Sequence, residues 1–258
     1  MIHDHEHDQG HGHEHSPDQG HGHTHEQGHN DHYHHDHGHD QHHAHGHQHG
    51  HGHDHHHGPH HHDLHSHPHI HSHTPSRLDN PVRAAELNPE ATLVRFGFQA
   101  GQVLCDIGAG SGIFTIPAAR LAAADPTTKV LALDIKPEML DAIRLKAQDA
   151  GLQNIDLRQV IDHGLPVEDH TVDLTLLVTV LHEIIDYPVF LSEIQRMLKP
   201  GGRLAVIEFH DRETPFGPPV PERLGQSAVT ERVTAAGFAA TESFELGPNF
   251  YALIFIKK

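Results

Sequence analysis

The clearest chemical signal in the sequence is a turn of alternating glycines after a short apolar run. Gly108, Gly110 and Gly112 are spaced as Gly-x-Gly-x-Gly, and Asp106 stands two residues before the first of them. Glycines let the backbone approach a ligand closely, and the helix that follows presents its first N–H groups to it. A dinucleotide fingerprint would also need glycine at 113, where this chain has Ile113, so the pattern differs from that motif.

A second acid follows at a spacing that suits a ribose. Asp134 ends the apolar run 129–134 and stands 22 residues after Gly112. A carboxylate in that place can accept hydrogen bonds from two neighbouring hydroxyl groups. A glycine turn alone is weak evidence, whereas the turn, Asp106, Asp134 and a regular series of later strands are strong evidence together.

The elements that must position these residues are short apolar runs that alternate with helical stretches. The patterns predict helices at 81–98, 111–124, 137–151, 188–198 and 227–236, and strands at 102–107, 129–134, 154–160, 172–178, 203–209, 238–246 and 250–256. Such alternation predicts an α/β fold built on a doubly wound parallel sheet. Ligands of these sheets bind at the carboxyl ends of the strands, which is where the glycine turn and Asp134 fall.

At these residues the chain resembles the class I S-adenosylmethionine-dependent methyltransferases. The likeness covers roughly 77–258 and rests on the segments 103–112, 131–140, 172–174, 181–183 and 198–204. Within the class it is most similar to small-molecule methyltransferases of the ubiquinone/menaquinone-biosynthesis type. The resemblance implies a Rossmann-like, mostly parallel sheet of seven strands in the order 3-2-1-4-5-7-6, with the last strand antiparallel and helices on both faces.

The resemblance also implies which residues bind S-adenosylmethionine. The glycine turn and Asp106 would surround the methionine part, Asp134 would hold the ribose, and Ile135 would pack on the adenine. The acid that usually follows the third strand aligns with Ile161 without a gap and with Asp162 after a shift of one residue. The expected cofactor-binding residues are therefore Asp106, Gly108, Gly110, Gly112, Asp134, Ile135, Asp162 and Thr179, the last because it follows the fourth strand.

Methyl transfer needs alignment of the acceptor with the methyl group, and a general base only if the acceptor must lose a proton. The candidate bases are His182, after the fourth strand, and His210, after the fifth. A packing or capping role for His182, at the start of an expected short helix, and a polar loop role for His210 are the alternatives. His182 does not begin a His-Glu-x-x-His metal pair, because position 186 is Asp186.

A different chemistry is concentrated at the other end of the chain. Residues 1–73 hold 33 of the 37 histidines, 11 acids and no Lys or Arg, and they have too few apolar residues to bury a core. We expect a disordered tail that binds Ni, Zn, Cu or Co, since neutral imidazoles alternate with carboxylates along it. The expected ligands include His11, His13, His15, His32, His34, His35, His53, His55, His56, His57, His60, His61 and His62. A solubilising arm is the alternative.

Composition excludes several other classes. The single Cys105 rules out a disulfide framework or a Cys-rich zinc module, and it makes arsenite an unsuitable acceptor. The formal net charge of −18 argues against a nucleic-acid partner. The sequence has no apolar run long enough to span a membrane and no secretion signal at its start, which predicts a cytoplasmic protein.

We expect a tail at 1–73, a linker at 74–76 and a methyltransferase domain at 77–258 that acts on a small molecule. A metal-storage or metal-chaperone protein that uses the fold as a scaffold is the alternative. The oligomeric state stays open.

Overall fold

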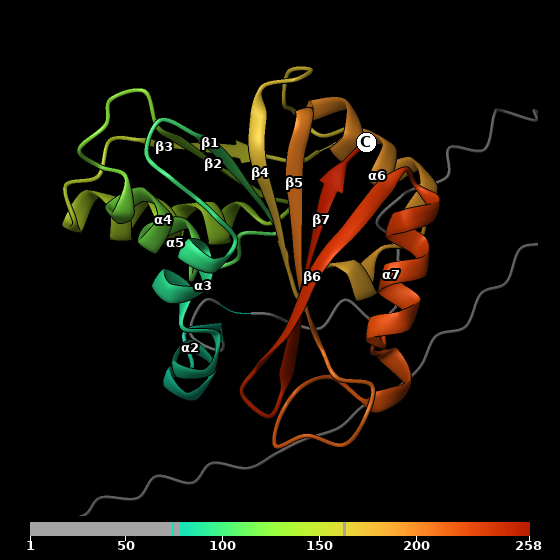
Figure 1. The fold of residues 1–258 in the computed structure, drawn as a ribbon. Coiled ribbons are helices and arrows are strands. Elements are labelled where there is room, and N and C mark those ends of the chain that lie inside the picture. The colour runs from blue at the N-terminus through green and yellow to red at the C-terminus, as the bar shows by residue number, and fades with distance from the viewer. Residues whose placement is uncertain (1–73, 75–77, 162–163) are drawn as a thin grey trace, which may run out of the picture. The chain divides into compact units, whose positions relative to one another are not determined.

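The computed structural model describes residue 74 and residues 78–161 and 164–258, all of which belong to one compact unit of the chain. Its centre is a seven-stranded sheet in the order β3-β2-β1-β4-β5-β7-β6 (Figure 1). Strands β1 to β5 pair in parallel, and β7 runs antiparallel to both β5 and β6. The predicted fold class, strand order and antiparallel last strand are confirmed.

The elements alternate along the chain as the sequence predicts. The strands are β1 Val103–Ile107, β2 Lys129–Asp134, β3 Ile155–Gln159, β4 Val172–Val178, β5 Leu198–Phe209, β6 Phe238–Leu246 and β7 Phe250–Lys257. The α-helices are α2 Pro81–Leu87, α3 Pro89–Arg95, α4 Thr115–Leu121, α5 Pro137–Asp149, α6 Tyr187–Met197 and α7 Gln226–Ala235, and the two short 3₁₀ helices are η1 Leu181–Glu183 and η2 Val220–Glu222.

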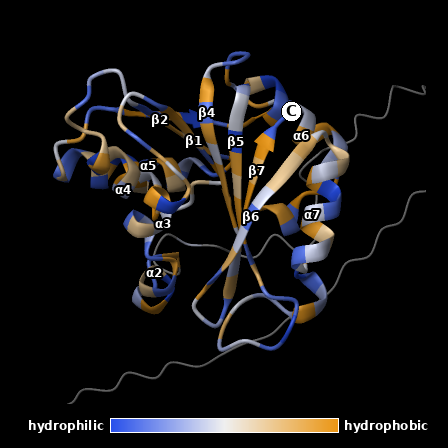
Figure 2. Ribbon diagram, viewed as in Figure 1, coloured by the Kyte–Doolittle hydropathy of each residue, from blue (hydrophilic) through white to orange (hydrophobic). Residues whose placement is uncertain are grey.

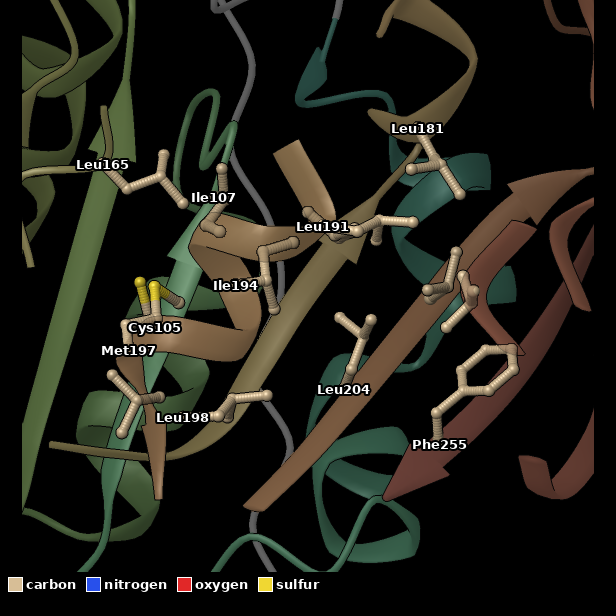
Figure 3. Close-up of a cluster of buried hydrophobic side chains, with 14 of the residues drawn as sticks. Cys105, Ile107, Leu165, Leu181, Leu191, Ile194, Met197, Leu198, Leu204 and Phe255 are labelled. Atoms are coloured by element: carbon tan, nitrogen blue, oxygen red, sulfur yellow. The ribbon is translucent and has the colours of Figure 1, made fainter. Parts of the chain in front are cut away.

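Both faces of the sheet are covered, because successive residues of each strand point to opposite sides. On one face Cys105 packs with Ile194 and Met197 of α6 (Figure 3). Val229 and Val233 of α7 belong to the same cluster. On the other face, side chains of β1, β4, β5 and β7 pack against α2, α3 and α4, while α5 covers β2. The central strands are therefore mostly apolar (Figure 2). The buried polar exceptions are Asp106 in β1, Thr175 in β4 and Glu208 in β5.

The predicted helix at 81–98 is wrong, because two short helices, α2 and α3, take its place. Between them Asn88 has a left-handed backbone (φ 38°) and caps the end of α2. Pro89 then opens α3, since a proline lacks the N–H that would continue the first helix and disfavours a helical residue before it.

Three other boundaries differ from the prediction. The helix expected from 111 begins only at Thr115 and ends at Leu121, because the last glycine of the turn keeps positive φ. The helix expected from Leu181 is only the single turn η1, and Asp186 instead caps α6 by accepting a hydrogen bond from Val189 N. Strand β5 begins five residues early, since Leu198 already pairs with Val172 before an irregularity in the ladder.

In the part of the chain that the structure describes, no helix is long and apolar enough to cross a membrane. The domain boundaries and the cytoplasmic location stay predictions from the sequence.

Candidate functional site

A cavity of about 470 Å³ opens where β1, β2 and β4 end. Its wall brings together most of the residues that the sequence singles out, although they lie up to 76 positions apart. They are Asp106, Gly108, Gly110, Asp134, Ile135, Thr179 and His182.

The glycine turn is fixed to the end of β2 by its own backbone. Gly108 N and Ala109 N both donate to Leu133 O, at 2.8 and 2.9 Å. Gly108 has φ +67°, and a Cβ there would lie 2.5 Å from Val180 Cγ2. Only glycine fits this position, because the turn after β4 packs directly on the turn after β1.

Asp134 is held in place by two backbone N–H groups. Gly110 N donates to its Oδ2 at 2.8 Å, and Lys136 N donates to its Oδ1 at 2.9 Å. Burial raises the pKa of the carboxyl, although these hydrogen bonds and the charge of Lys136 oppose the rise. Each carboxylate oxygen can accept more than one hydrogen bond, so the side chain can still serve two hydroxyl groups on the cavity side.

Asp106 is the most deeply buried acid of the cavity wall. Its Oδ2 accepts a hydrogen bond from Thr115 Oγ1 at 2.7 Å. Burial raises its pKa to about 6, with help from the charge of Asp134 and against the effects of Thr115 and Arg83. A carboxyl group kept this dry favours a positively charged partner, such as an ammonium group, in the cavity.

Arg83 also lines the cavity, and the sequence analysis missed it. Its Nη2 donates to Thr179 Oγ1 at 3.1 Å, and Thr179 itself has a left-handed backbone with φ 55°. Burial lowers the pKa of Arg83 to about 10, while the charges of Asp106, Asp79 and Glu208 partly restore it. The spacing could have indicated that Arg83 is buried, because it stands four residues before Leu87 and therefore on the same face of α2.

Glu208 is a second residue that the sequence analysis missed. It lies near the end of β5, is 1% exposed, and contacts His182 twice. His182 N donates to Glu208 Oε1 at 3.2 Å, and the ring Nδ1 lies 2.8 Å from Oε2. An acid inside the apolar run Leu204–Phe209 was the available signal.

The remaining predicted residues lie elsewhere. Gly112 is not part of the cavity wall; with φ +86° it packs against Ile143 of α5. His210 is also outside the cavity wall, and its ring packs on Tyr251. Its Nε2 lies 2.6 Å from Glu245 Oε2, but the two groups do not have hydrogen-bond geometry. Asp162 and the tail histidines lie outside the described residues.

Comparison with known proteins shows which proteins this arrangement resembles. A family model described as a methyltransferase domain matches residues 105–206, from the middle of β1 to β5. The match includes the glycine turn, Asp134 and His182, but neither Arg83 nor Glu208.

Two relatives that are similar in sequence are named as methyltransferases. The chain is 35% identical over 126 residues to the ubiquinone/menaquinone biosynthesis C-methyltransferase UbiE of Hahella chejuensis. The aligned residues make up 48% of this chain and 50% of that protein. It is 39% identical over 113 residues to the demethylmenaquinone methyltransferase of Tropheryma whipplei, 44% of each chain. The chain thus spans about half the length of these relatives.

A solved structure extends the likeness beyond residues 105–206. The crystal structure of a SAM dependent methyltransferase from Aquifex aeolicus matches with a TM-score of 0.68 and 27% identity, over 72% of this chain and all of that one. Together these findings support a class I S-adenosylmethionine-dependent methyltransferase.

Proposed function

We propose that this protein transfers a methyl group from S-adenosylmethionine to a small-molecule acceptor. One observation carries the proposal: the glycine turn, Asp106 and Asp134 line a single cavity at the carboxyl ends of three adjacent strands. That is the place where a sheet of this kind receives its cofactor. The names of the relatives, which are methyltransferases, support the same activity.

The residues of the wall fit the parts of S-adenosylmethionine. The spare acceptor capacity of Asp134 suits the two ribose hydroxyls, and the buried carboxyl of Asp106 suits the ammonium group of the methionine part. Arg83 supplies a guanidinium to the same wall and suits the methionine carboxylate. Ile135 contributes an apolar surface to the wall and suits the adenine ring. When bound, S-adenosylmethionine supplies an electrophilic methyl group on a sulfonium.

The other wall of the cavity suits an apolar acceptor. This part of the lining includes the charged Glu222 and Arg223. Its apolar side chains are Ile184, Phe190, Pro221 and Leu224, which come from the turn after β4, from α6 and from the Pro-rich segment 212–225. These side chains would exclude water from the acceptor and leave its reactive atom free to approach the methyl group.

Equilibrium binding to the full-length protein tests the proposal. We expect isothermal titration to show one site for S-adenosylmethionine and one for S-adenosylhomocysteine. Methylthioadenosine, which lacks the amino-acid part, should bind more weakly because Asp106 and Arg83 lose their partners. The absence of binding to correctly folded protein would defeat the proposal.

We also propose that the His-rich tail binds divalent transition metals independently of methyl transfer. The support is compositional, namely imidazoles that alternate with carboxylates along 73 residues. Within residues 78–161 and 164–258 the structure brings together no group of three or more His, Cys, Asp or Glu that could hold a metal.

Fewer than one Ni²⁺ or Zn²⁺ bound per chain would reject this function. If deleting the tail abolishes metal resistance in cells and leaves methyl transfer unchanged, the two functions are separate. A metal-storage role for the whole chain would instead predict no binding of S-adenosylmethionine.

A further inference from the structure

His182 and Glu208 form a buried pair at the wall of the cavity. The side chain of Glu208 is 1% exposed and that of His182 is 7% exposed, and Nδ1 lies 2.8 Å from Oε2. The backbone N–H of His182 donates to the other carboxylate oxygen at 3.2 Å. Two contacts to one carboxylate fix both the position and the ring orientation of the histidine.

The pair also decides which ring nitrogen can act on a ligand. An ionised carboxylate only accepts hydrogen bonds, so Nδ1 of His182 carries a hydrogen and Nε2 is the basic atom of the neutral ring. His182 lines the cavity, whereas Glu208 does not. Its Nε2 lies 4.0 Å from Glu183 Oε1, and Glu183 lines the same cavity as His182.

The turn that carries His182 lies beside the expected position of the methyl donor. Val180, two residues earlier, packs on Gly108 so closely that a Cβ would not fit between them. Thr179, at the start of the same turn, accepts a hydrogen bond from Arg83. An acceptor between His182 and the glycine turn would therefore meet the basic nitrogen and the methyl group together.

The charges around His182 favour its protonated form. Burial alone would lower its pKa, but the charge and hydrogen bond of Glu208 and the charges of Glu183 and Glu222 outweigh that effect and raise it. The Phe209 ring of β5 packs against the imidazole in a T-shaped arrangement, and the cations Arg83 and Arg223 line the same cavity. The charge of Glu208 acts to raise the pKa of Arg83 against the larger effect of burial. Burial raises the pKa of Tyr187 and of Tyr251, and the charge of Glu208 adds to this effect.

We propose that His182 is the general base of methyl transfer, that Glu208 is its positioning residue, and that the acceptor carries a phenolic hydroxyl. The inference rests on the proposed function above. The hydroxyl proton passes to Nε2, the electron pair left on oxygen forms the bond to the methyl carbon, and the bond from the methyl group to sulfur breaks with its electrons on sulfur. The products are an aryl methyl ether, neutral S-adenosylhomocysteine and a protonated His182, which returns its proton to solvent.

The strength of the base suits this class of acceptor. An imidazole with a pKa somewhat above its ordinary value can assist the ionisation of a phenol, whose pKa is about 10, whereas an aliphatic alcohol is far too weak an acid. An aromatic ring also matches the apolar wall made by Ile184, Phe190 and Leu224.

The test measures transfer from methyl-labelled S-adenosylmethionine by the full-length protein. The acceptors are p-cresol and naphthol, with anisole and cyclohexanol as controls that lack a phenolic proton. The variants are His182→Gln, Glu208→Gln and, as a matched control, His170→Gln. His170 lies just before the opposite end of β4, and its ring contacts Leu198 O and Lys257 Nζ. Binding of S-adenosylhomocysteine and thermal unfolding show that each variant is folded.

We expect label in the phenols only, and a loss of about 10²- to 10⁴-fold in kcat/KM for His182→Gln with the affinity for S-adenosylhomocysteine kept. In the unaltered protein kcat/KM should rise with pH as His182 loses its proton. Glu208→Gln should shift this rise to lower pH, because the neighbouring charge that raises the pKa is gone. A role in packing alone would lower stability without moving the pH profile.

Three results would overturn the inference: no phenol methylated although S-adenosylmethionine binds, His182→Gln as active as His170→Gln, or an unchanged pH profile in Glu208→Gln. If S-adenosylmethionine itself does not bind, the proposed function fails first and this inference fails with it.

Discussion

Replacing Asp134 by alanine tests the cofactor site most directly. Both carboxylate oxygens are held by backbone N–H groups, at 2.8 Å from Gly110 and 2.9 Å from Lys136, so the side chain is oriented before any ligand arrives. Two charge-assisted hydrogen bonds to ribose hydroxyls contribute on the order of 2–4 kcal/mol. Asp134→Ala should therefore weaken the binding of S-adenosylhomocysteine roughly 30- to 700-fold.

The assay is isothermal titration with S-adenosylhomocysteine, combined with urea unfolding. The alanine also leaves two backbone N–H groups without their acceptor, so we expect the free energy of unfolding to fall by roughly 1–3 kcal/mol. Asp156→Ala is the matched control, because Asp156 lies on the neighbouring strand β3, is about half exposed and pairs with Arg158 at the surface. It should change the affinity less than twofold. A folded Asp134→Ala protein that binds within threefold of the unaltered protein would refute the ribose role.

Three further predictions concern stability and metal binding. Asp106→Asn should raise the free energy of unfolding at pH 7 by about 2–3 kcal/mol and flatten its pH dependence in urea unfolding. The sign follows from the raised pKa: the stability linked to this carboxyl is full below about 4, the unfolded value, and is lost as the pH rises through about 6. An unchanged pH dependence would contradict this reasoning. Gly112→Ala should lower the midpoint of thermal unfolding more than Gly151→Ala, since both have positive φ but only Gly112 would bring a Cβ to 2.9 Å from Ile143; equal effects would show that backbone strain alone matters. Metal binding by the tail should weaken from pH 7.5 to pH 5.5 in Ni²⁺ titrations, because protons compete for imidazole, and carboxylate ligation alone would leave it nearly unchanged.

The sequence was most informative where a local pattern has a single structural meaning. The spacing of Gly108, Gly110 and Gly112 predicts a turn that only glycine can form, and the structure gives all three positive φ. The run Val172–Val178 is predicted to the residue, because a central parallel strand must be apolar on both faces. The resemblance in turn supplied the strand order, which the structure confirms.

The predictions failed where a single residue sets the boundary of a helix, or where a residue distant in the sequence sets the orientation of a side chain. Asn88 and Pro89 divide an expected helix, although apolar residues continue past them. His182 stands near the end of β4 as expected, but Glu208, 26 positions later, orients its ring. No local pattern joins two such residues, because the pairing of β4 with β5 brings them together.

The sequence by itself therefore determined the fold class, the glycine turn and the two acids that line the cavity, since these follow from the periodicity and spacing of neighbouring residues. It also set the His-rich composition of residues 1–73. Only the tertiary structure placed Arg83 at the cavity wall, paired the ring of His182 with the buried Glu208 and excluded His210 from the wall. Burial and charge act between side chains that the sheet brings together, so distance in space, and not along the chain, decides these properties.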